Sequence, residues 1–244
     1  MSDTRASWHD RLDVDLDPST DGVVEVCFTG RGVPGSEPTA ARGAAVRSVV
    51  PPELDAAWAH QVHGADVADV AGRRDGECGE ADALVSDRTD LGLGVVTADC
   101  VPVLLTDGRQ IAAVHAGWRG VVAKVVDATV DRFDSAPTVA WIGPAISGEV
   151  YEVGDEVADQ VVAVSAPEVA HLGPRGRAHV DLRRAVALQL AARGVDDVRM
   201  IGPCTFSTPG LWSHRRESRA GLKAGRNVSA IWRTIGRTTG RRDV

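Results

Sequence analysis

The chain has 244 residues, 43% of them hydrophobic and 25% charged, and a formal net charge of −7 at pH 7. This length and apolar content suffice for one large domain, whereas the negative charge argues against a general nucleic-acid-binding protein. No apolar run is long enough to cross a bilayer, and the first twenty residues lack the apolar segment of a signal peptide, so we expect a cytoplasmic protein with no membrane partner.

The first third of the chain predicts short strands and one helix. Its polar start is expected to be a loosely held lead-in, outside a domain that spans residues 23–233. Composition and punctuation by glycine and proline then give the following elements. They are a lead-in at 1–22, a strand at 23–29, a glycine-rich loop at 30–35, a helix at 40–50, an extended segment at 58–67, a charged loop at 73–80 and a strand at 81–87.

The centre of the chain carries the strongest pattern. Two β-branched runs, 94–106 and 110–115, are joined by Asp107-Gly108, which predicts a tight turn between paired strands. Cys100 then lies on the first strand and His115 at the end of the second. A glycine-bearing loop and a helix over 120–133 follow, and the start of such a helix can receive an anion.

The rest of the chain alternates helices and strands, which indicates a mixed α/β class. Asp181 is placed to cap a helix that Gly194 closes. The basic residues after the last strand form a tail, 234–244, that we expect to be solvated. The predicted elements are a strand at 138–142, a helix ending near 164, a loop at 165–178, a helix at 182–193 and strands at 197–201 and 228–232.

Three side chains could hold a metal ion. His63, Cys100 and His115 offer two imidazoles and one thiolate, which suits tetrahedral zinc with a fourth position open for water or substrate. Copper is a less favoured occupant. The four cysteines contain no C-x-x-C pair and are widely spaced, which fits reduced thiols rather than disulfides.

A metal-free site would use the same atoms. In that alternative Cys100 is a nucleophile, His115 its base and His63 a second base, while backbone N–H groups near Gly117 hold an oxyanion. In a regular strand the Asp99 side chain would face away from Cys100. A bulge in the strand could instead place it close enough to support the metal ligands. We nevertheless count Asp99 among the candidate catalytic residues.

Substrate contacts are expected on both sides of these residues. Arg119, beside the start of the predicted helix, is the expected phosphate ligand, and Gly117 and Gln61 are further candidates. Ser213, with Arg215 and Arg216 after it, marks a second candidate site for an anionic substrate. The chain has seven histidines and no His-x-His pair, too few for a trinuclear copper cluster beside a blue-copper centre, so four-copper oxidase chemistry is not expected.

Several blocks, in this order, resemble the motifs of the YfiH family, which is variously named peptidoglycan editing factor, purine nucleoside phosphorylase and multicopper polyphenol oxidoreductase laccase. The resemblance runs from about residue 23 to residue 232. The blocks are Gln61-Val62-His63-Gly64, Ala81-Asp82-Ala83-Leu84-Val85, Thr97-Ala98-Asp99-Cys100-Val101-Pro102-Val103, Ala113-Val114-His115-Ala116-Gly117-Trp118-Arg119-Gly120, Ile142-Gly143-Pro144, Tyr151-Glu152-Val153, Cys204-Thr205 and Ser213-His214-Arg215-Arg216.

The resemblance implies a single-domain α/β/β/α sandwich of mixed sheets with zinc on His63, Cys100 and His115. It implies phosphorolysis of adenosine, inosine, guanosine and methylthioadenosine, and deamination of adenosine. The family pattern near the N-terminus has an asparagine-containing motif that is absent from residues 28–40, where Arg31 is kept as a candidate anion contact.

These observations predict a zinc enzyme that acts on purine nucleosides and phosphate. Asp99 and Glu152 are candidate proton donors to the leaving base. Two other hypotheses stay open: a cysteine-type amidase that edits peptidoglycan precursors, and a metal-stabilised, non-enzymatic factor for the envelope or cell division. Nothing in the sequence specifies an oligomeric state.

Overall fold

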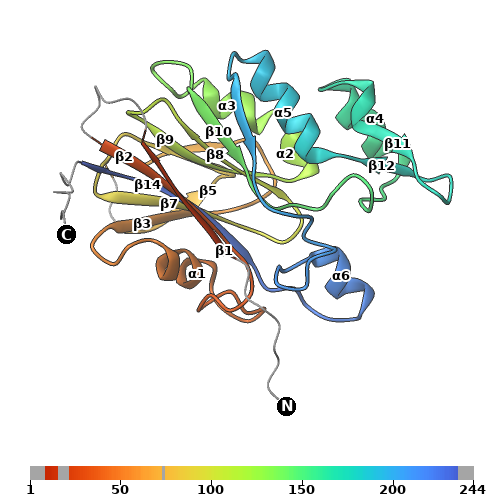
Figure 1. Cartoon of the computed structure of the whole chain (residues 1–244), viewed down its shortest axis with the longest axis horizontal. Coiled ribbons are helices and arrows are strands. Elements are labelled where there is room, and N and C mark those ends of the chain that lie inside the picture. Colours follow the sequence, from red (N-terminus) through yellow and green to blue (C-terminus); the bar gives the residue numbers. More distant parts are fainter. Residues whose placement is uncertain (1–8, 16–21, 73–74, 236–244) are drawn as a thin grey trace, which may run out of the picture.

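The computed structural model describes residues 9–15, 22–72 and 75–235. Within them, two six-stranded sheets face each other (Figure 1). The first sheet has the order β1 (His9–Asp15), β2 (Gly22–Thr29), β14 (Asn227–Ile235), β7 (Leu91–Thr97), β3 (Asp55–His60) and β5 (Gly76–Glu80). The second has the order β13 (Asp197–Met200), β10 (Val139–Ile142), β8 (Val101–Thr106), β9 (Ile111–Ala116), β6 (Ala83–Ser86) and β4 (Val67–Asp69).

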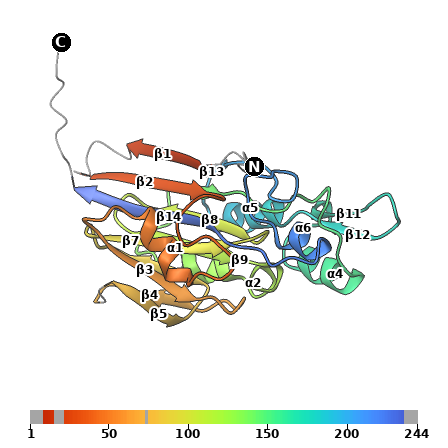
Figure 2. The ribbon, with the colours of Figure 1, turned by 90° about the horizontal axis from the view of Figure 1, so that it is seen from below.

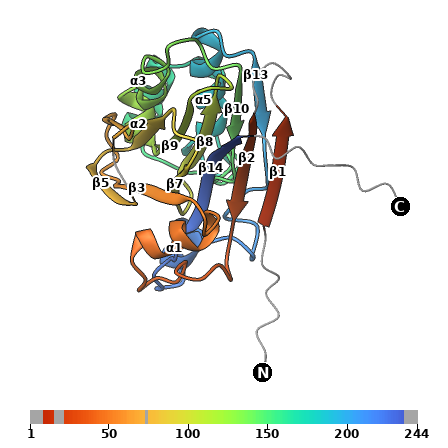
Figure 3. The same cartoon turned by 90° about the vertical axis from the view of Figure 1, so that its left-hand side faces the viewer.

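Helices cover the outer face of each sheet, as Figure 3 shows. Helix α1 packs on the first sheet, and α2, α3 and α5 pack on the second. A short hairpin of β11 and β12 lies beside α4, and α6 lies at the same end of the molecule (Figures 1 and 2). The bounds are α1 (Arg42–Val49), α2 (Trp118–Val122), α3 (Val125–Val130), α4 (Asp155–Ala163), a 3₁₀ turn (Pro167–Val169), β11 (Ala170–Leu172), β12 (Ala178–Val180), α5 (Leu182–Ala192) and α6 (His214–Arg219).

Successive residues of β7 face alternately the second sheet and helix α1, so this strand packs against both. Leu91, Leu93 and Val95 are buried between the sheets, and burying each such side chain contributes about 1.5–3 kcal/mol. Gly92 and Gly94 face α1, where an added Cβ would lie 2.6 Å from Val50 and 2.4 Å from Val46. The glycines therefore allow α1 to approach the sheet closely.

The mixed α/β class and the α/β/β/α sandwich are confirmed. Both sheets combine parallel and antiparallel pairs. Asp181 caps α5 as predicted, because its carboxylate accepts the backbone N–H of Arg184 at 2.9 Å, and Gly194 follows with φ +78°. No helix in the described ranges has both the length and the apolar character to span a bilayer.

The prediction of one strand over 94–106 is wrong, because these residues belong to two strands in different sheets. β7 ends at Thr97, the chain bends through Asp99 at φ +91°, and β8 begins at Val101. The predicted turn at Asp107-Gly108 does join paired strands, β8 and β9. The long helix predicted over 120–133 is also two helices, because Lys124 adopts φ +60° between α2 and α3.

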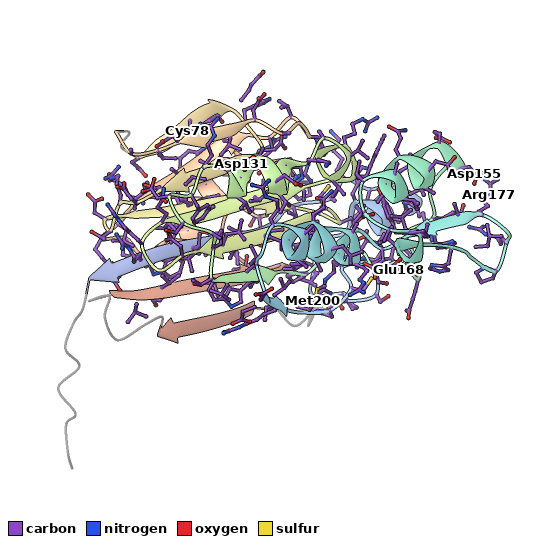
Figure 4. The ribbon with its side chains drawn as sticks, turned by 90° about the horizontal axis from the view of Figure 1, so that it is seen from above. Cys78, Asp131, Asp155, Glu168, Arg177 and Met200 are labelled. Carbon is purple, nitrogen blue, oxygen red and sulfur yellow. The ribbon has the colours of Figure 1, made fainter. Side chains whose placement is uncertain are left out.

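Other differences arise where the sequence predicts a loop or lead-in and the structure has a polar strand. Residues 9–15 pair with β2 as β1, within the predicted lead-in, and residues 76–80 form β5. The β11–β12 hairpin lies within the predicted loop at 165–178. Cys78, expected in a loop, is buried on β5 at the opposite end of the molecule from Asp155 and Arg177 (Figure 4). The rest of the lead-in, 1–8 and 16–21, and tail residues 236–244 lie outside the described residues.

Candidate metal centre and its two cavities

Three residues from separate segments meet at one point. His63 follows β3, Cys100 precedes β8, and His115 is the penultimate residue of β9. Their ligand atoms all lie within 4.8 Å of one another. The two imidazole rings meet edge to face, with 4.8 Å between their centroids. We call these three residues the ligand cluster.

Asp82 holds two members of the ligand cluster in place. Its Oδ1 accepts a hydrogen bond from Nδ1 of His115 at 2.7 Å and from the backbone N–H of His63 at 2.9 Å. Its Oδ2 accepts from the N–H of Gly64 at 2.6 Å. Because Asp82 occupies Nδ1 of His115, Nε2 is the nitrogen left to bind an ion, an arrangement common behind metal-bound histidines.

Unusual backbone conformations bring the ligands together. His63 has φ +64°, which a residue with a side chain rarely adopts. The backbone N–H groups of Val62, His63 and Gly64 donate to the Asp82 carboxylate and stabilise this turn. Gly117 lies against the cluster. A Cβ at that position would be 3.0 Å from Cδ2 of His63 and 3.1 Å from Sγ of Cys100, so only glycine leaves both ligands undisturbed.

Cys100 and His115 form a thiolate–imidazolium pair in the ligand cluster, and His115 must lose its proton before it binds a metal ion. Burial tends to raise the pKa of Cys100, but His115 and His63 outweigh it and lower that pKa to about 6. Burial tends to lower the pKa of His115, but the Cys100 thiolate and Asp82 raise it to about 9. In the free protein Cys100 is thus a thiolate at neutral pH, the form that binds a cation.

The donor set and its surroundings fit a catalytic divalent ion. Two imidazoles and one thiolate are three of the four ligands of a tetrahedral site and leave one position open. Asp82 supplies the carboxylate that orients such ligands. The space that a Cβ on Gly117 would fill is left clear beside Cys100 and His63.

Two cavities of about 270 Å³ each open onto the ligand cluster. Four residues line both of them: His63, Ala98, Cys100 and His214. We call the first the arginine cavity and the second the aromatic cavity. The arginine cavity is also lined by Arg42, Gln61, Val96, Thr97, His115 and Arg226. The aromatic cavity is also lined by Asp99, Trp118, Arg119, Ile146, Tyr151, Leu182 and Arg215.

The structure brings some of the predicted substrate residues to these cavities. Arg119 lines the aromatic cavity with its guanidinium 4.3 Å from the centroid of the Trp118 ring. Arg215 lines the same cavity and donates to the backbone carbonyl of Glu152 at 2.8 Å. Gln61 lines the arginine cavity, but both ends of its amide bond to the backbone of Val96, at 2.8 and 2.9 Å.

Other predicted residues have structural partners. Arg31 forms an ion pair with Glu217 and lines neither cavity. The hydroxyl of Ser213 caps α6 by accepting the N–H of Arg216 at 3.1 Å. Asp99 lines the aromatic cavity, but its carboxylate accepts from Thr205 at 2.6 Å and from the N–H of Arg215 at 2.7 Å.

Sequence reasoning missed several residues of the site. Asp82 stands in a quoted motif, but nothing in its neighbourhood along the chain indicates a contact with His115. His214 lines both cavities, and Tyr151 lines the aromatic one. Arg42 and Arg226 lie far apart in the sequence and meet only because α1 and the segment before β14 adjoin the same cavity.

The chain is similar to known proteins over most of its length. A family model described as multi-copper polyphenol oxidoreductase laccase matches residues 39–234. The chain is 39% identical over 188 residues to purine nucleoside phosphorylase PA4543 of Pseudomonas aeruginosa, covering 74% of this chain and 75% of that one. It is 36% identical over 181 residues to purine nucleoside phosphorylase YfiH of Escherichia coli, covering 72% of each.

A solved structure extends the similarity to three dimensions. The crystal structure of Neisseria meningitidis protein NMB0706 superposes on this fold with a TM-score of 0.73 at 28% identity, covering 92% of this chain and 99% of that one. The family inferred from the ordered motifs is thereby confirmed. The chain belongs to the YfiH family, whose sequence model carries the multi-copper polyphenol oxidoreductase laccase description.

Proposed function

We propose that this protein is a zinc-dependent purine nucleoside phosphorylase that accepts adenosine, inosine, guanosine and methylthioadenosine. The observation that carries the proposal is the ligand cluster at the junction of two cavities, both of which include arginines and one of which also includes aromatic rings. Relatives covering about three quarters of the chain bear the name purine nucleoside phosphorylase, which supports the same reaction class.

Phosphorolysis exchanges one bond at the sugar for another. An oxygen of hydrogen phosphate bonds to C1′, the C1′–N9 bond breaks, and its electron pair leaves with the base. The proton lost by the phosphate is the one that the base gains. The protein must therefore hold the two reactants in line on different sides of C1′, and two cavities that meet at His63, Cys100 and His214 can do so.

The metal and the protein have separate tasks. A divalent ion on His63, Cys100 and His115 would supply Lewis acidity and lower the pKa of a bound water. Asp82 keeps the ligands oriented. Tyr151 stays protonated and able to donate a hydrogen bond, because burial and then the negative charge of Cys100 raise its pKa to about 12.

Neither predicted proton donor is well placed for that role. The Asp99 carboxylate already accepts two hydrogen bonds. Glu152 lines neither cavity, and the hydrogen bond from Arg175 lowers its pKa below the usual value. We infer that the proton reaches the base through phosphate or solvent.

The test is to incubate metal-replete protein with adenosine and inorganic phosphate. We expect adenine and ribose 1-phosphate in equal amounts, and no reaction with the Cys100→Ala variant. The proposal fails if neither adenine nor inosine appears, or if Cys100→Ala matches the unaltered protein.

Deamination of adenosine is a second reaction that we propose for the same site. The donor set supports it, because nucleobase deaminases use histidine and cysteine ligands to activate water. Inosine should then form from adenosine without phosphate. The same ligands would be needed, so Cys100→Ala should abolish both reactions together.

A cysteine-type amidase that acts on peptidoglycan precursors is the rival, favoured by the ion pair between the Cys100 thiolate and His115. An amidase of this kind would keep its activity after chelation. Four-copper oxidase chemistry lacks the ligands, because the described residues form one cluster of three metal-binding side chains.

A further inference from the structure

The arginine cavity contains two guanidinium groups, Arg42 and Arg226, and its lining residues include no carboxylate, so the Cys100 thiolate is the negative group among them. Arg42 donates through Nη1 to the carbonyl of Gln61 at 3.2 Å, and Arg226 donates through Nη1 to the carbonyls of Ala224 and Gly225 at 3.2 and 2.9 Å. Among the described residues neither guanidinium has a carboxylate within ion-pair distance. Each therefore keeps donors for a ligand, since a guanidinium has five N–H groups.

The two guanidinium groups influence each other. The pKa of Arg226 is lowered by burial first and by the positive charge of Arg42 second, and the negative charge of Cys100 opposes this only in part. Partly buried like charges of this kind are unfavourable unless an anion lies between them. Arginine also offers paired donors that match the oxygens of a phosphate.

A third group in this cavity lacks a partner. Thr97 lines the cavity and is 2% exposed, and its hydroxyl has no hydrogen-bond partner among the described residues. Buried polar groups nearly always have one. Thr97 pairs across the sheet with Asn227, the residue after Arg226, so Thr97 and Arg226 come from adjacent strand ends that border the same cavity.

The aromatic cavity also contains two arginines, Arg119 and Arg215, but it adds the carboxylate of Asp99 and the rings of Trp118 and Tyr151. The guanidinium of Arg215 lies 5.2 Å from the centroid of the Tyr151 ring, and Arg119 lies over Trp118. Ile146 and Leu182 complete an apolar wall. Flat aromatic and aliphatic surfaces of this kind suit a purine base, which binds by stacking.

We propose that the arginine cavity binds the phosphate, through Arg42, Arg226 and the hydroxyl of Thr97, and that the aromatic cavity binds the purine base. This assignment rests on the proposed phosphorolysis and extends it. It places the sugar at the shared boundary beside the ligand cluster, and it moves the main phosphate contact away from Arg119, where the sequence predicts it.

Steady-state kinetics with inosine and inorganic phosphate test the assignment. We expect Arg42→Gln and Arg226→Gln each to raise the KM for phosphate about tenfold or more and to change the KM for inosine less than about twofold. Thr97→Val should raise the phosphate KM by a smaller factor, whereas Thr97→Ser, which keeps the hydroxyl, should match the unaltered protein. Arg199→Gln, at an exposed arginine paired with Asp197, is the matched control.

A binding measurement makes the test independent of turnover. Isothermal titration with inorganic phosphate alone should show binding to the unaltered protein and to Arg199→Gln, and binding about tenfold weaker or absent in Arg226→Gln. If Arg226→Gln does not fold, Thr97→Val against Thr97→Ser gives the same comparison.

The outcomes separate this inference from the proposed function. An active phosphorylase whose phosphate KM rises with Arg119→Gln and not with Arg226→Gln overturns the assignment alone. A protein that binds phosphate through Arg226 but releases no base from any nucleoside supports the anion site and overturns phosphorolysis.

Discussion

The two cavities have the same volume, about 270 Å³, and share His63, Ala98, Cys100 and His214, and each has two arginines, yet their other lining residues differ. The arginine cavity adds the Thr97 hydroxyl and no carboxylate, whereas the aromatic cavity adds the rings of Trp118 and Tyr151, aliphatic surface and the carboxylate of Asp99. Under the proposed assignment, one metal centre serves two unlike reactants. Changes to shared residues should therefore affect both reactants, and changes to one wall should affect only one.

The largest effect is expected at the shared thiolate. Cys100→Ala removes one of three ligands at the boundary of both cavities, so phosphorolysis and deamination should both fall to background in coupled spectrophotometric assays. Cys78→Ala, which removes a buried cysteine on β5, is the matched control and should retain the activity. Loss of only one of the two reactions would contradict the claim that both depend on the residues shared by the two cavities.

A smaller effect on both reactants is expected from Asp82→Asn. The amide cannot accept every hydrogen bond that the carboxylate accepts from His115, His63 and Gly64. Loss of such an orienting partner typically lowers metal affinity about 10–100-fold. Competition with a chromogenic chelator measures this affinity, and the exposed Asp66→Asn serves as control. An affinity equal to that of the unaltered protein would show that Asp82 does not orient the ligands.

Only the nucleoside should respond to a change in the aromatic wall. Trp118→Ala removes a ring from the aromatic cavity, and base stacking on an aromatic side chain is worth about 1–3 kcal/mol. The KM for inosine should rise by roughly five- to a hundredfold, while the KM for phosphate stays unchanged. An increase in the phosphate KM alone would show that the aromatic cavity binds phosphate, and it would overturn the assigned roles of the two cavities.

The sequence predicted the ligands better than it predicted the walls. His63, Cys100 and His115 have side chains suited to metal binding, and the predicted strand pairing and the family motifs distinguished them from the other histidines and cysteines. Asp82, Thr97 and Arg226 are ordinary residues whose roles depend on what the fold places beside them. The same limit applies to the secondary structure. A β-branched composition predicted β8 and β9, but the bend at Asp99 and the break at Lys124 depend on left-handed backbone conformations at non-glycine residues.

The smallest effect concerns the reactivity of the free protein. Because the pKa of Cys100 is lowered from 9.0 to about 6, its thiolate persists as the pH falls and is lost only below about pH 6. Alkylation of metal-free protein by iodoacetamide, measured by mass spectrometry at Cys100, should therefore keep its rate down to about that pH. Added zinc should protect the thiolate. A rate that declines from pH 9 downward would place the thiol away from His115.

Elemental analysis of the purified protein tests most directly whether three distant residues hold one ion. We expect about one zinc per chain in the unaltered protein and none above background in Cys100→Ala prepared in the same way. Equal metal content in both proteins, or none in either after zinc is supplied, would contradict the metal centre on which both cavities depend.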